Sequence, residues 1–349
     1  MPHFPAARRV IVSGLDGHAY PAAVIEVGRL SGPLWCESFG RLTYAPDAPA
    51  CGPGTIFDLA SLTKVIATTS IAMRLVAGKT IALDAPAAQF APAFTGDERK
   101  AISIRHLLTH SSGLPAHARL WETVSGRDAF ERAIAQLPLE RPPGAQSVYS
   151  DPGFMLLGLA LEHVGRATLD DMFQPLAAEL GEIWYRPAAA LIDRIAPTEQ
   201  DPWRGRLLRG EVHDENAAAL GGVAAHAGLF GTAAAVGTFA RLVLRTFNES
   251  TVLGSPELVR QFATRSQVPN SSRALGWDTM LPTSSCGTRL SPTAIGHTGF
   301  TGTSLWIDSE RDVYVVFLTN RVHPTRDNNA LAALRPNVHD AVIEDLETE

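Results

Sequence analysis

The segment FDLASLTKVIATTSIAMRLV, residues 57–76, decides how the rest of the chain is interpreted. It contains Ser61 and Lys64, and residues three apart lie above one another on one face of a helix. If a helix begins at or just after Ser61, the hydroxyl lies at its positive end and the amine lies one turn along. The spacing predicts a helix that runs to about Ala77 and ends at Gly78, with a nucleophile beside a group that can handle its proton.

The basic residues of the chain make Lys64 stand out. The sequence has only three lysines, at positions 64, 79 and 100, and the other 27 of its 30 basic residues are arginines. Arginine stays protonated at working pH, whereas a buried lysine can lose its proton. Lys64 is therefore a candidate proton acceptor for Ser61. Because Ser-x-x-Lys fixes only two residue types, this interpretation needs further partners along the chain.

Composition limits the class of protein. The 349 residues are 45% hydrophobic and 19% charged, which is typical of a soluble globular protein with a large core. The net charge of −6 and the lack of a basic run argue against nucleic-acid partners. Residues 217–244 are apolar, but His226 and Arg241 interrupt them, so we expect no membrane span. The sequence indicates no oligomeric state.

The N-terminal residues and the cysteines are the features that indicate the cellular compartment of the protein. The first residues contain no continuous apolar stretch followed by a small-residue cleavage site. Three cysteines without metal-type spacing predict reduced thiols and a cytoplasmic protein. A periplasmic protein whose leader had been removed would look the same.

The order of strand and helix patterns predicts an α+β fold. Residues 22–44 alternate as a hairpin, and TSLWID and DVYVVFLTN near residues 303–320 form a second one. Helical patterns lie between the two hairpins, at 126–137, from Pro152 and from Ala233. A further helical pattern follows the second hairpin, at 329–346. We expect a central antiparallel sheet flanked by helices, with an inserted all-α lobe. The predicted single domain, residues 1–349, has an α/β lobe of 1–85 plus 270–349 and a mainly helical lobe of 86–269.

A metal site is one alternative. His106 and His110 are four residues apart, a spacing that can bind a metal on a helix. No Glu lies between them in the metalloprotease arrangement, and no third ligand is evident. We interpret both as structural residues of a helix and predict no metal and no organic cofactor.

Two later motifs complete the pattern that began at residue 61. The chain carries SLTK at 61–64, YSD at 149–151 and HTG at 297–299. In that order they resemble the three motifs of the serine β-lactamase and penicillin-binding-protein superfamily. The similarity is greatest to its class C β-lactamase-like branch, which includes esterases and D-peptidases. Most of the chain shares it, as in GTIFDLASLTK, ISIRHLLTHSSGLP, PGAQSVYSDPGFMLLG, GGVAAHAGLFGTA and HTGFTGTSLWID.

The resemblance implies a role for each matched residue. Ser61 would be the acylated nucleophile, and Lys64 and Tyr149 would handle protons as one coupled unit. A phenol with a pKa near 10 is a useful base only if a nearby cation favours its phenolate. Which of the two takes the Ser61 proton stays open. The strand at Gly299 would lie beside Ser61, so that the backbone N–H groups of Phe300 and Ser61 form an oxyanion hole.

Two motif positions depart from the branch. His297 stands where β-lactamases have Lys, and a neutral His puts in doubt the recognition of a carboxylate by a fixed positive charge. Asp151 stands where Asn is usual. It would pair with Lys64, bind a substrate amine, or turn away as a cap residue before Pro152. His226 is a substrate-side residue by resemblance or a structural His of a Gly-rich loop.

One further stretch and the overall function complete the predictions. The polar run at residues 213–216 is a rim of the substrate site or a cap for the next helix. We predict a serine hydrolase that forms an acyl-enzyme with small esters, amides or short peptides. Because of His297, esterase or peptidase activity is favoured over efficient β-lactam hydrolysis. The alternative is a catalytically silent relative that binds a peptidoglycan fragment.

Overall fold

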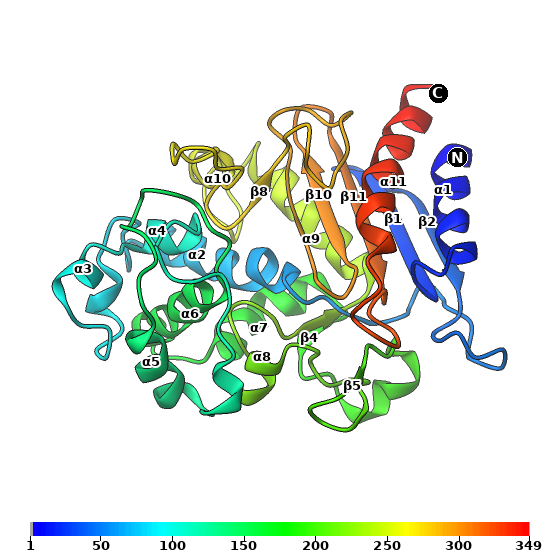
Figure 1. The fold of residues 1–349 in the computed structure, drawn as a ribbon. Helices are drawn as coiled ribbons and strands as arrows, with labels where there is room; N and C mark the ends of the chain where they lie inside the picture. The colour runs from blue at the N-terminus through cyan, green and yellow to red at the C-terminus, as the bar shows by residue number, and fades with distance from the viewer. Residues whose placement is uncertain (1–2, 349) are drawn as a thin grey trace.

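A six-stranded antiparallel sheet forms one side of the molecule (Figure 1). The structure is a computed structural model that describes residues 3–348. The strand order is β2-β1-β11-β10-β9-β8. The strands are β1 Ala22–Arg29, β2 Gly32–Gly40, β8 Asp278–Thr279, β9 Ile295–Thr298, β10 Ser304–Asp308 and β11 Val313–Thr319.

Both predicted hairpins are present, and they pair with each other. β1 pairs with β2, β10 pairs with β11, and β1 also pairs with β11, with Val24 opposite Leu318. The β1–β11 pair therefore joins the two hairpins into one sheet, although these strands lie about 290 residues apart in sequence. β9 pairs with β10 and places His297 opposite Leu305. The predicted α+β class with a central antiparallel sheet is confirmed.

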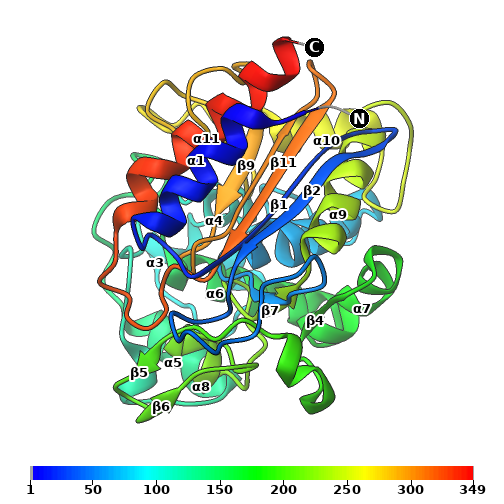
Figure 2. The same cartoon turned by 90° about the vertical axis from the view of Figure 1, so that its right-hand side faces the viewer.

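Helices cover both faces of the sheet. Along β1, Ala23, Ile25 and Val27 point into one hydrophobic cluster, whereas Ala22 and Val24 point into another. This is the alternation expected of a strand buried on both sides. α1 (Pro5–Asp16) and α11 (Ala330–Glu347) lie side by side on one face, and α9 (Ala233–Thr246) packs on the other (Figure 2).

Helix α1 was not among the sequence predictions. Its preceding residue, Phe4, supplies no side-chain cap. The carboxylate of Asp345, on α11, instead accepts hydrogen bonds from Ala6 N at 3.1 Å and Ala7 N at 2.9 Å. The cap of this helix therefore comes from the other end of the chain, and no local start signal marks it.

The middle of the chain is mainly helical and lies beside the sheet (Figure 1). Its helices are α2 Ser70–Ala77, α3 Asp97–Lys100, α4 Ile104–Leu108, α5 Arg127–Gln136, α6 Asp151–Gly165, α7 Leu169–Leu180, α8 Glu215–Ala219 and α10 Pro256–Ala263. Short 3₁₀ turns occur at η2 Ala87–Gln89, η3 Leu120–Glu122 and η4 Ala189–Arg194. Two small sheets are built from β3 Phe57–Asp58, β7 Leu229–Gly231 and β4 Ile183–Tyr185, and from β5 Gln200–Asp201 and β6 Arg206–Leu207. The lobe boundaries at 86 and 269 stay a prediction; α9, inside the predicted helical lobe, packs on the sheet.

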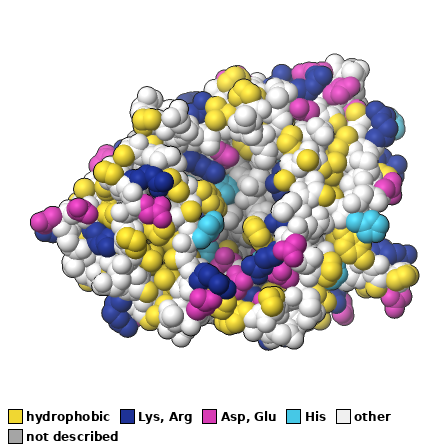
Figure 3. Space-filling model, viewed as in Figure 1, with side chains coloured by type: hydrophobic (Ala, Val, Ile, Leu, Met, Phe, Trp, Pro, Cys, Tyr) yellow, Lys and Arg dark blue, Asp and Glu magenta, His cyan; other side chains and the backbone are white. Residues whose placement is uncertain are grey.

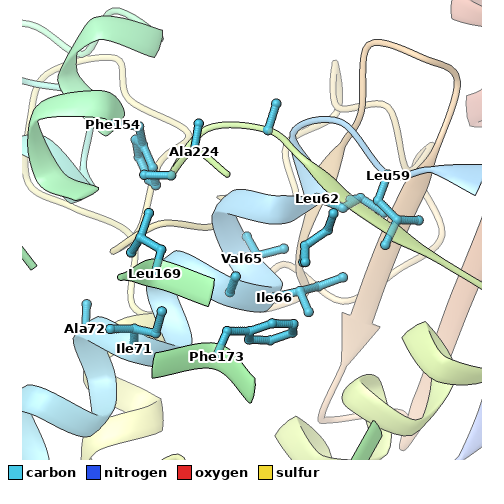
Figure 4. Packing of buried hydrophobic residues seen from close by; sticks show 14 of the residues in the cluster. Leu59, Leu62, Val65, Ile66, Ile71, Ala72, Phe154, Leu169, Phe173 and Ala224 are labelled. Atoms are coloured by element: carbon cyan, nitrogen blue, oxygen red, sulfur yellow. The ribbon is translucent and has the colours of Figure 1, made fainter. Parts of the chain in front are cut away.

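The helix predicted from residue 61 is real but differs in its first turns. Residues Lys64–Thr69 form a π-helix, η1, before α2 continues to Ala77. The hydroxyl of Thr69 donates to Lys64 O, five residues back, at 2.8 Å. Such π segments are rare and often occur at functional sites. The apolar side chains of this region pack against α6 and α7, where Phe154, Leu169 and Phe173 lie (Figure 4).

Between residues 3 and 348, no helix has both the length and the apolar character needed to cross a bilayer.

Candidate active site

A strained turn presents Ser61 at the end of β3. Ala60, just before it, has a φ of +46°, in the left-handed region that residues with a Cβ seldom adopt. The buried carboxylate of Asp58 holds this turn by accepting from Ala60 N at 2.8 Å and from His213 N at 2.7 Å. Ser61 is thereby lifted out of the strand and placed one turn before η1.

Three predicted residues meet at the Ser61 hydroxyl. Lys64 Nζ donates to Ser61 Oγ at 3.0 Å, and Tyr149 OH donates to it at 2.9 Å. The Lys64 ammonium also lies 4.8 Å from the centre of the Tyr149 ring. Tyr149 lies 88 residues after Ser61, so only the tertiary structure brings them together. This is the nucleophile-and-base geometry that acyl transfer requires.

Lys64 is held as a cation. Its side chain is fully buried, and Nζ also donates to Asp151 Oδ1 at 2.8 Å and to His226 O at 3.0 Å. Burial lowers the pKa of Lys64, but Asp151 and Tyr149 raise it by more, so the net direction is upward. Burial would raise the pKa of Asp151, but Lys64 and His117 lower it well below its usual range. Of the three alternatives for Asp151, the structure selects the pair with Lys64.

Tyr149 lies among cationic and aromatic groups. The Arg273 guanidinium lies 5.0 Å from the centre of its ring, and the rings of His110 and His297 lie 4.5 and 5.7 Å away. Burial raises the pKa of Tyr149, and Lys64 opposes that rise. The phenol is therefore protonated at neutral pH, and the adjacent Lys64 cation favours its phenolate once the proton leaves.

His297 is neutral, and an arginine lies beside it. The His297 Nδ1–H donates to Thr298 O at 2.8 Å, because a carbonyl oxygen can only accept. This leaves Nε2 as the acceptor, 3.4 Å from Arg273 Nη1. Burial, Arg273 and Lys64 together lower the pKa of His297 well below its usual value. A positive charge, that of Arg273, therefore lies beside the neutral His297. No motif pointed to this residue among the 27 arginines.

The loop after β9 is tied to the nucleophile turn. Thr301 Oγ1 donates to Asp58 O at 2.7 Å, and Thr303 Oγ1 donates to Leu59 O at 3.0 Å. At Gly299, an added Cβ would come within 2.6 Å of Leu59 O and 2.1 Å of Thr303 Oγ1. Only glycine allows this close approach.

The same loop contains Phe300, whose backbone N–H is one of the two donors of the predicted oxyanion hole. Within residues 3–348, neither Ser61 N–H nor Phe300 N–H donates a hydrogen bond to the protein. Two free donors on neighbouring, mutually bonded segments are what an oxyanion hole needs.

The two histidines of the metal alternative have structural partners. His106 Nδ1 accepts from Ser103 N at 3.2 Å and completes the cap of α4. His110 Nδ1 accepts from Ser150 N at 3.0 Å. Across the described part of the chain, no group of three or more His, Cys, Asp or Glu is arranged to hold a metal ion.

The remaining candidates lie on one side of Ser61. His226 contributes its carbonyl oxygen to Lys64, while its ring Nε2 lies 2.8 Å from Asp214 Oδ1. Asp214 caps α8 by accepting from Ala217 N at 2.7 Å, so the predicted cap role of the 213–216 run is confirmed. The same run also lines a cavity beside Ser61, as the rim alternative expected.

His117 was missed by sequence reasoning. Its Nδ1 lies 3.2 Å from Asp151 Oδ2, and Asp151 raises the pKa of His117. It lies in a loop 32 residues before Tyr149, outside every recognised motif, so no local pattern marked it.

Two cavities meet at the nucleophile. Ser61, Tyr149 and Phe300 line both of them. One, of about 320 Å³, contains Arg273, Arg321 and Arg335, and none of its twelve described lining residues is acidic. The other, of about 490 Å³, is lined by residues of both charges, with His117 and Trp121. Figure 3 shows a hollow on this face, with basic, acidic and histidine side chains around it.

Comparisons with known proteins agree with this architecture. The family model named Beta-lactamase matches residues 7–339. A "Putative D-alanyl-D-alanine carboxypeptidase" of Escherichia coli K12 is 32% identical over 77% of this chain and 70% of its own length. An N-acetylmuramyl-L-alanine amidase of Bacillus subtilis strain 168 is 30% identical over 77% of this chain and 68% of its own.

Solved structures share the fold. The penicillin-binding protein homologue from Caulobacter crescentus superposes with a TM-score of 0.79, at 18% identity, over 98% of this chain and 97% of that one. The class C β-lactamase from Rhodobacter sphaeroides gives 0.77, at 21% identity, over 98% and 99%. EstCE1, a hydrolase with promiscuous acyltransferase activity, gives 0.76, at 21% identity, over 97% of each chain. The chain belongs to the beta-lactamase family and is a serine hydrolase.

Proposed function

We propose that Ser61 is the acylated nucleophile and that Tyr149 is its base. Asp151 keeps Lys64 as an ammonium ion, so the base acts in the fraction of the enzyme whose Tyr149 phenol has first lost its proton to solvent. Lys64 stabilises this phenolate, which then takes the proton of Ser61. Ser61 Oγ attacks the carbonyl carbon, and the N–H groups of Ser61 and Phe300 hold the oxyanion.

In the later steps, Tyr149 gives up each proton that it has accepted. When the C–N or C–O bond breaks, Tyr149 gives its proton to the leaving atom, and the acyl group stays on Ser61. A water molecule then attacks the ester while Tyr149 takes its proton, and the acid is released with Ser61 restored. Every proton gained by Tyr149 is returned, so the cycle needs no cofactor.

We further propose that the leaving group carries a carboxylate close to the bond that is cut. The observation that carries this proposal is Arg273, whose guanidinium lies over the Tyr149 ring, 5.0 Å from its centre, and 3.4 Å from His297 Nε2. Tyr149 must lie beside the leaving atom to protonate it. A planar guanidinium suits bidentate recognition of a carboxylate. In this proposal Arg273 supplies the positive charge that the neutral His297 does not carry.

The relatives support this substrate class. A carboxypeptidase and an amidase of the named kinds both break an amide bond and release an amino acid or peptide. We propose that the substrate here is likewise an N-acyl amino acid or short peptide. Its acyl part would occupy the cavity of about 490 Å³ that contains Asp151 and His117.

The acyl-enzyme is tested with the intact protein. A p-nitrophenyl ester should be turned over, and a fluorophosphonate should add its mass to Ser61. The Ser61→Ala protein should show neither result. A wild-type protein that gains no adduct and no turnover would instead support a silent relative that binds a peptidoglycan fragment.

The carboxylate is tested with paired substrates. N-Acetyl-D-alanyl-D-alanine and its C-terminal carboxamide share every other group. We expect the free carboxylate to be preferred at least tenfold in kcat/KM, and the Arg273→Gln variant to lose that preference, as one charged hydrogen-bond pair is removed. Arg9→Gln, on the exposed face of α1, is the matched control. Equal rates for the two substrates would contradict the proposal.

We also propose a cytoplasmic location. Cys36, Cys51 and Cys286 are free, and the last two are buried apart from one another in different clusters. Free thiols are typical of a reducing compartment. Cell fractionation of the native protein distinguishes the cytoplasm from the periplasm.

A further inference from the structure

A buried arginine in the cavity beside Ser61 has no hydrogen-bond or ion-pair partner among the described residues. Arg335, on α11, is only 9% exposed and lines the cavity of about 320 Å³. Its Nε is buried without a hydrogen bond, and no ion pair joins its guanidinium to any residue from 3 to 348. A charge removed from water without a partner is costly, so a native site that keeps one requires an explanation.

The surroundings of Arg335 increase that cost. Burial, and after it the like charge of Arg321, lower the pKa of Arg335 to about 10. Arg321 donates to the carbonyl oxygens of Phe300, Arg326 and Asn328 and, within residues 3–348, to no carboxylate. Both guanidinium groups are still charged at neutral pH, and both line the same cavity.

The first turn of α11 lies at the same wall. Asn329, Leu331 and Ala332 line the cavity, and α11 is 18 residues long. No acidic residue lies in its first turn, and Asn329 makes no side-chain cap. Ala330 N donates to Asn328 Oδ1 at 3.1 Å and Ala332 N donates to Asn329 O at 3.0 Å, so among the described residues only Leu331 N–H of this first turn has no partner. The start of the helix adds a positive potential, which favours an anion. The helix end and the unpartnered Arg335 are independent observations that point to the same kind of ligand.

This wall is distinct from the position of Arg273. Arg273 contacts Tyr149 and His297, next to the bond that is cut. Arg321 instead contacts Phe300, with its guanidinium 4.6 Å from the ring centre and its Nε donating to Phe300 O at 2.9 Å. The cavity therefore offers two cationic positions on different structural elements. Its volume of about 320 Å³ suits a small leaving group.

We propose that Arg335, Arg321 and the first turn of α11 form a second anion subsite, so that the preferred leaving group is an amino acid with an acidic side chain. This inference rests on the proposed function, in which Arg273 holds the carboxylate next to the cut bond. The second carboxylate fills the position that the protein leaves unpaired. Glutamate and aspartate are the smallest leaving groups with this chemistry.

The test compares leaving groups that differ in one charge. N-Acetyl-D-alanyl substrates that release glutamate, glutamine or alanine are supplied, each in D and L forms at the leaving residue. We expect glutamate to exceed its neutral isostere glutamine at least tenfold in kcat/KM. Arg335→Gln should reduce this ratio to near one, Arg335→Lys should keep part of it, and the Arg9→Gln control should leave it unchanged. A wild-type ratio near one, or a ratio that survives in Arg335→Gln, overturns the proposal.

A binding measurement separates this inference from the proposed function. Titration calorimetry on the inactive Ser61→Ala protein compares glutarate with its monoamide. Tighter binding of glutarate that is lost in Ser61→Ala/Arg335→Gln supports the subsite, whereas equal binding contradicts it. If alanine and glutamate are both released without discrimination, only the second subsite fails. If no carboxylate-bearing leaving group is released while a p-nitrophenyl ester is turned over through Ser61, the proposed function fails.

Discussion

Lys64 and Asp151 form a buried ion pair, with Lys64 Nζ donating to Asp151 Oδ1 at 2.8 Å. The same Nζ lies 3.0 Å from Ser61 Oγ, so the pair is part of the candidate active site and not a distant support. By resemblance, Asp151 occupies the position where related proteins have Asn. A neutral amide there would leave Lys64 with only neutral partners. In this chain the carboxylate keeps Lys64 as a cation, which is why we propose Tyr149 as the base.

Replacing Asp151 by Asn should move the pH profile to lower pH. The negative charge of Asp151 raises the pKa of both Lys64 and Tyr149. Removing that charge lowers both values, so the deprotonated base becomes available at lower pH, and the rising limb of kcat/KM shifts in the acid direction. The measurement is the pH dependence of ester hydrolysis for Asp151→Asn against the exposed control Asp97→Asn. A limb that stays in place or moves to higher pH would show that Asp151 does not set these pKa values.

Removing the Tyr149 hydroxyl should slow the reaction without unfolding the protein. Tyr149 OH has Ser61 Oγ as its hydrogen-bond partner, so Tyr149→Phe keeps the ring contacts with His110 and His297. We expect kcat to fall about 10²–10⁴-fold, the range for loss of a general base. Steady-state kinetics are compared with Ser61→Ala, which should fall further because the nucleophile is lost. A Tyr149→Phe enzyme with near wild-type kcat would assign the base to Lys64.

Gly299→Ala should damage the oxyanion hole. The new Cβ would lie 2.6 Å from Leu59 O, which is backbone and cannot move without disturbing the turn that holds Ser61. Displacing Phe300 N–H should lower kcat about 10²–10³-fold, the usual effect of losing one such donor. Gly52→Ala is the matched control, since an added Cβ there meets nothing within 4 Å. The idea fails if Gly299→Ala and Gly52→Ala have equal kcat values.

Asp345→Ala should destabilise the fold through α1. Asp345 is buried and accepts from Ala6 N and Ala7 N, which begin this helix. Loss of a helix cap usually lowers the free energy of unfolding by about 0.5–2 kcal/mol, and the buried position of Asp345 places it toward the upper part of that range. Denaturant unfolding of Asp345→Ala should be compared with that of its exposed neighbour Glu344→Ala. Identical midpoints for the two variants would contradict a capping role.

Much of the fold follows from local patterns. Residues 22–44 and 303–320 are rich in β-branched and aromatic residues, which favour strands, and they predicted both hairpins. Ser150 and Thr232 mark the starts of α6 and α9 as side-chain caps. α1 escaped prediction because its cap lies 339 residues away in the chain. The π-helix η1 escaped it because an apolar helical pattern does not distinguish a π-helix from an α-helix.

The sequence by itself determined the chemistry at Ser61, and the tertiary structure decided its electrostatics. Ser61 and Lys64 are brought together by helix spacing alone, so their partnership is visible in four residues. The charge state of Lys64 depends on Asp151, 87 residues away, and the cation beside His297 is Arg273, which reaches the site from outside the third motif. Coulomb interactions between buried groups act through space over a few ångströms, irrespective of separation along the chain. Sequence order cannot specify them, and the packing of the sheet against the helices does.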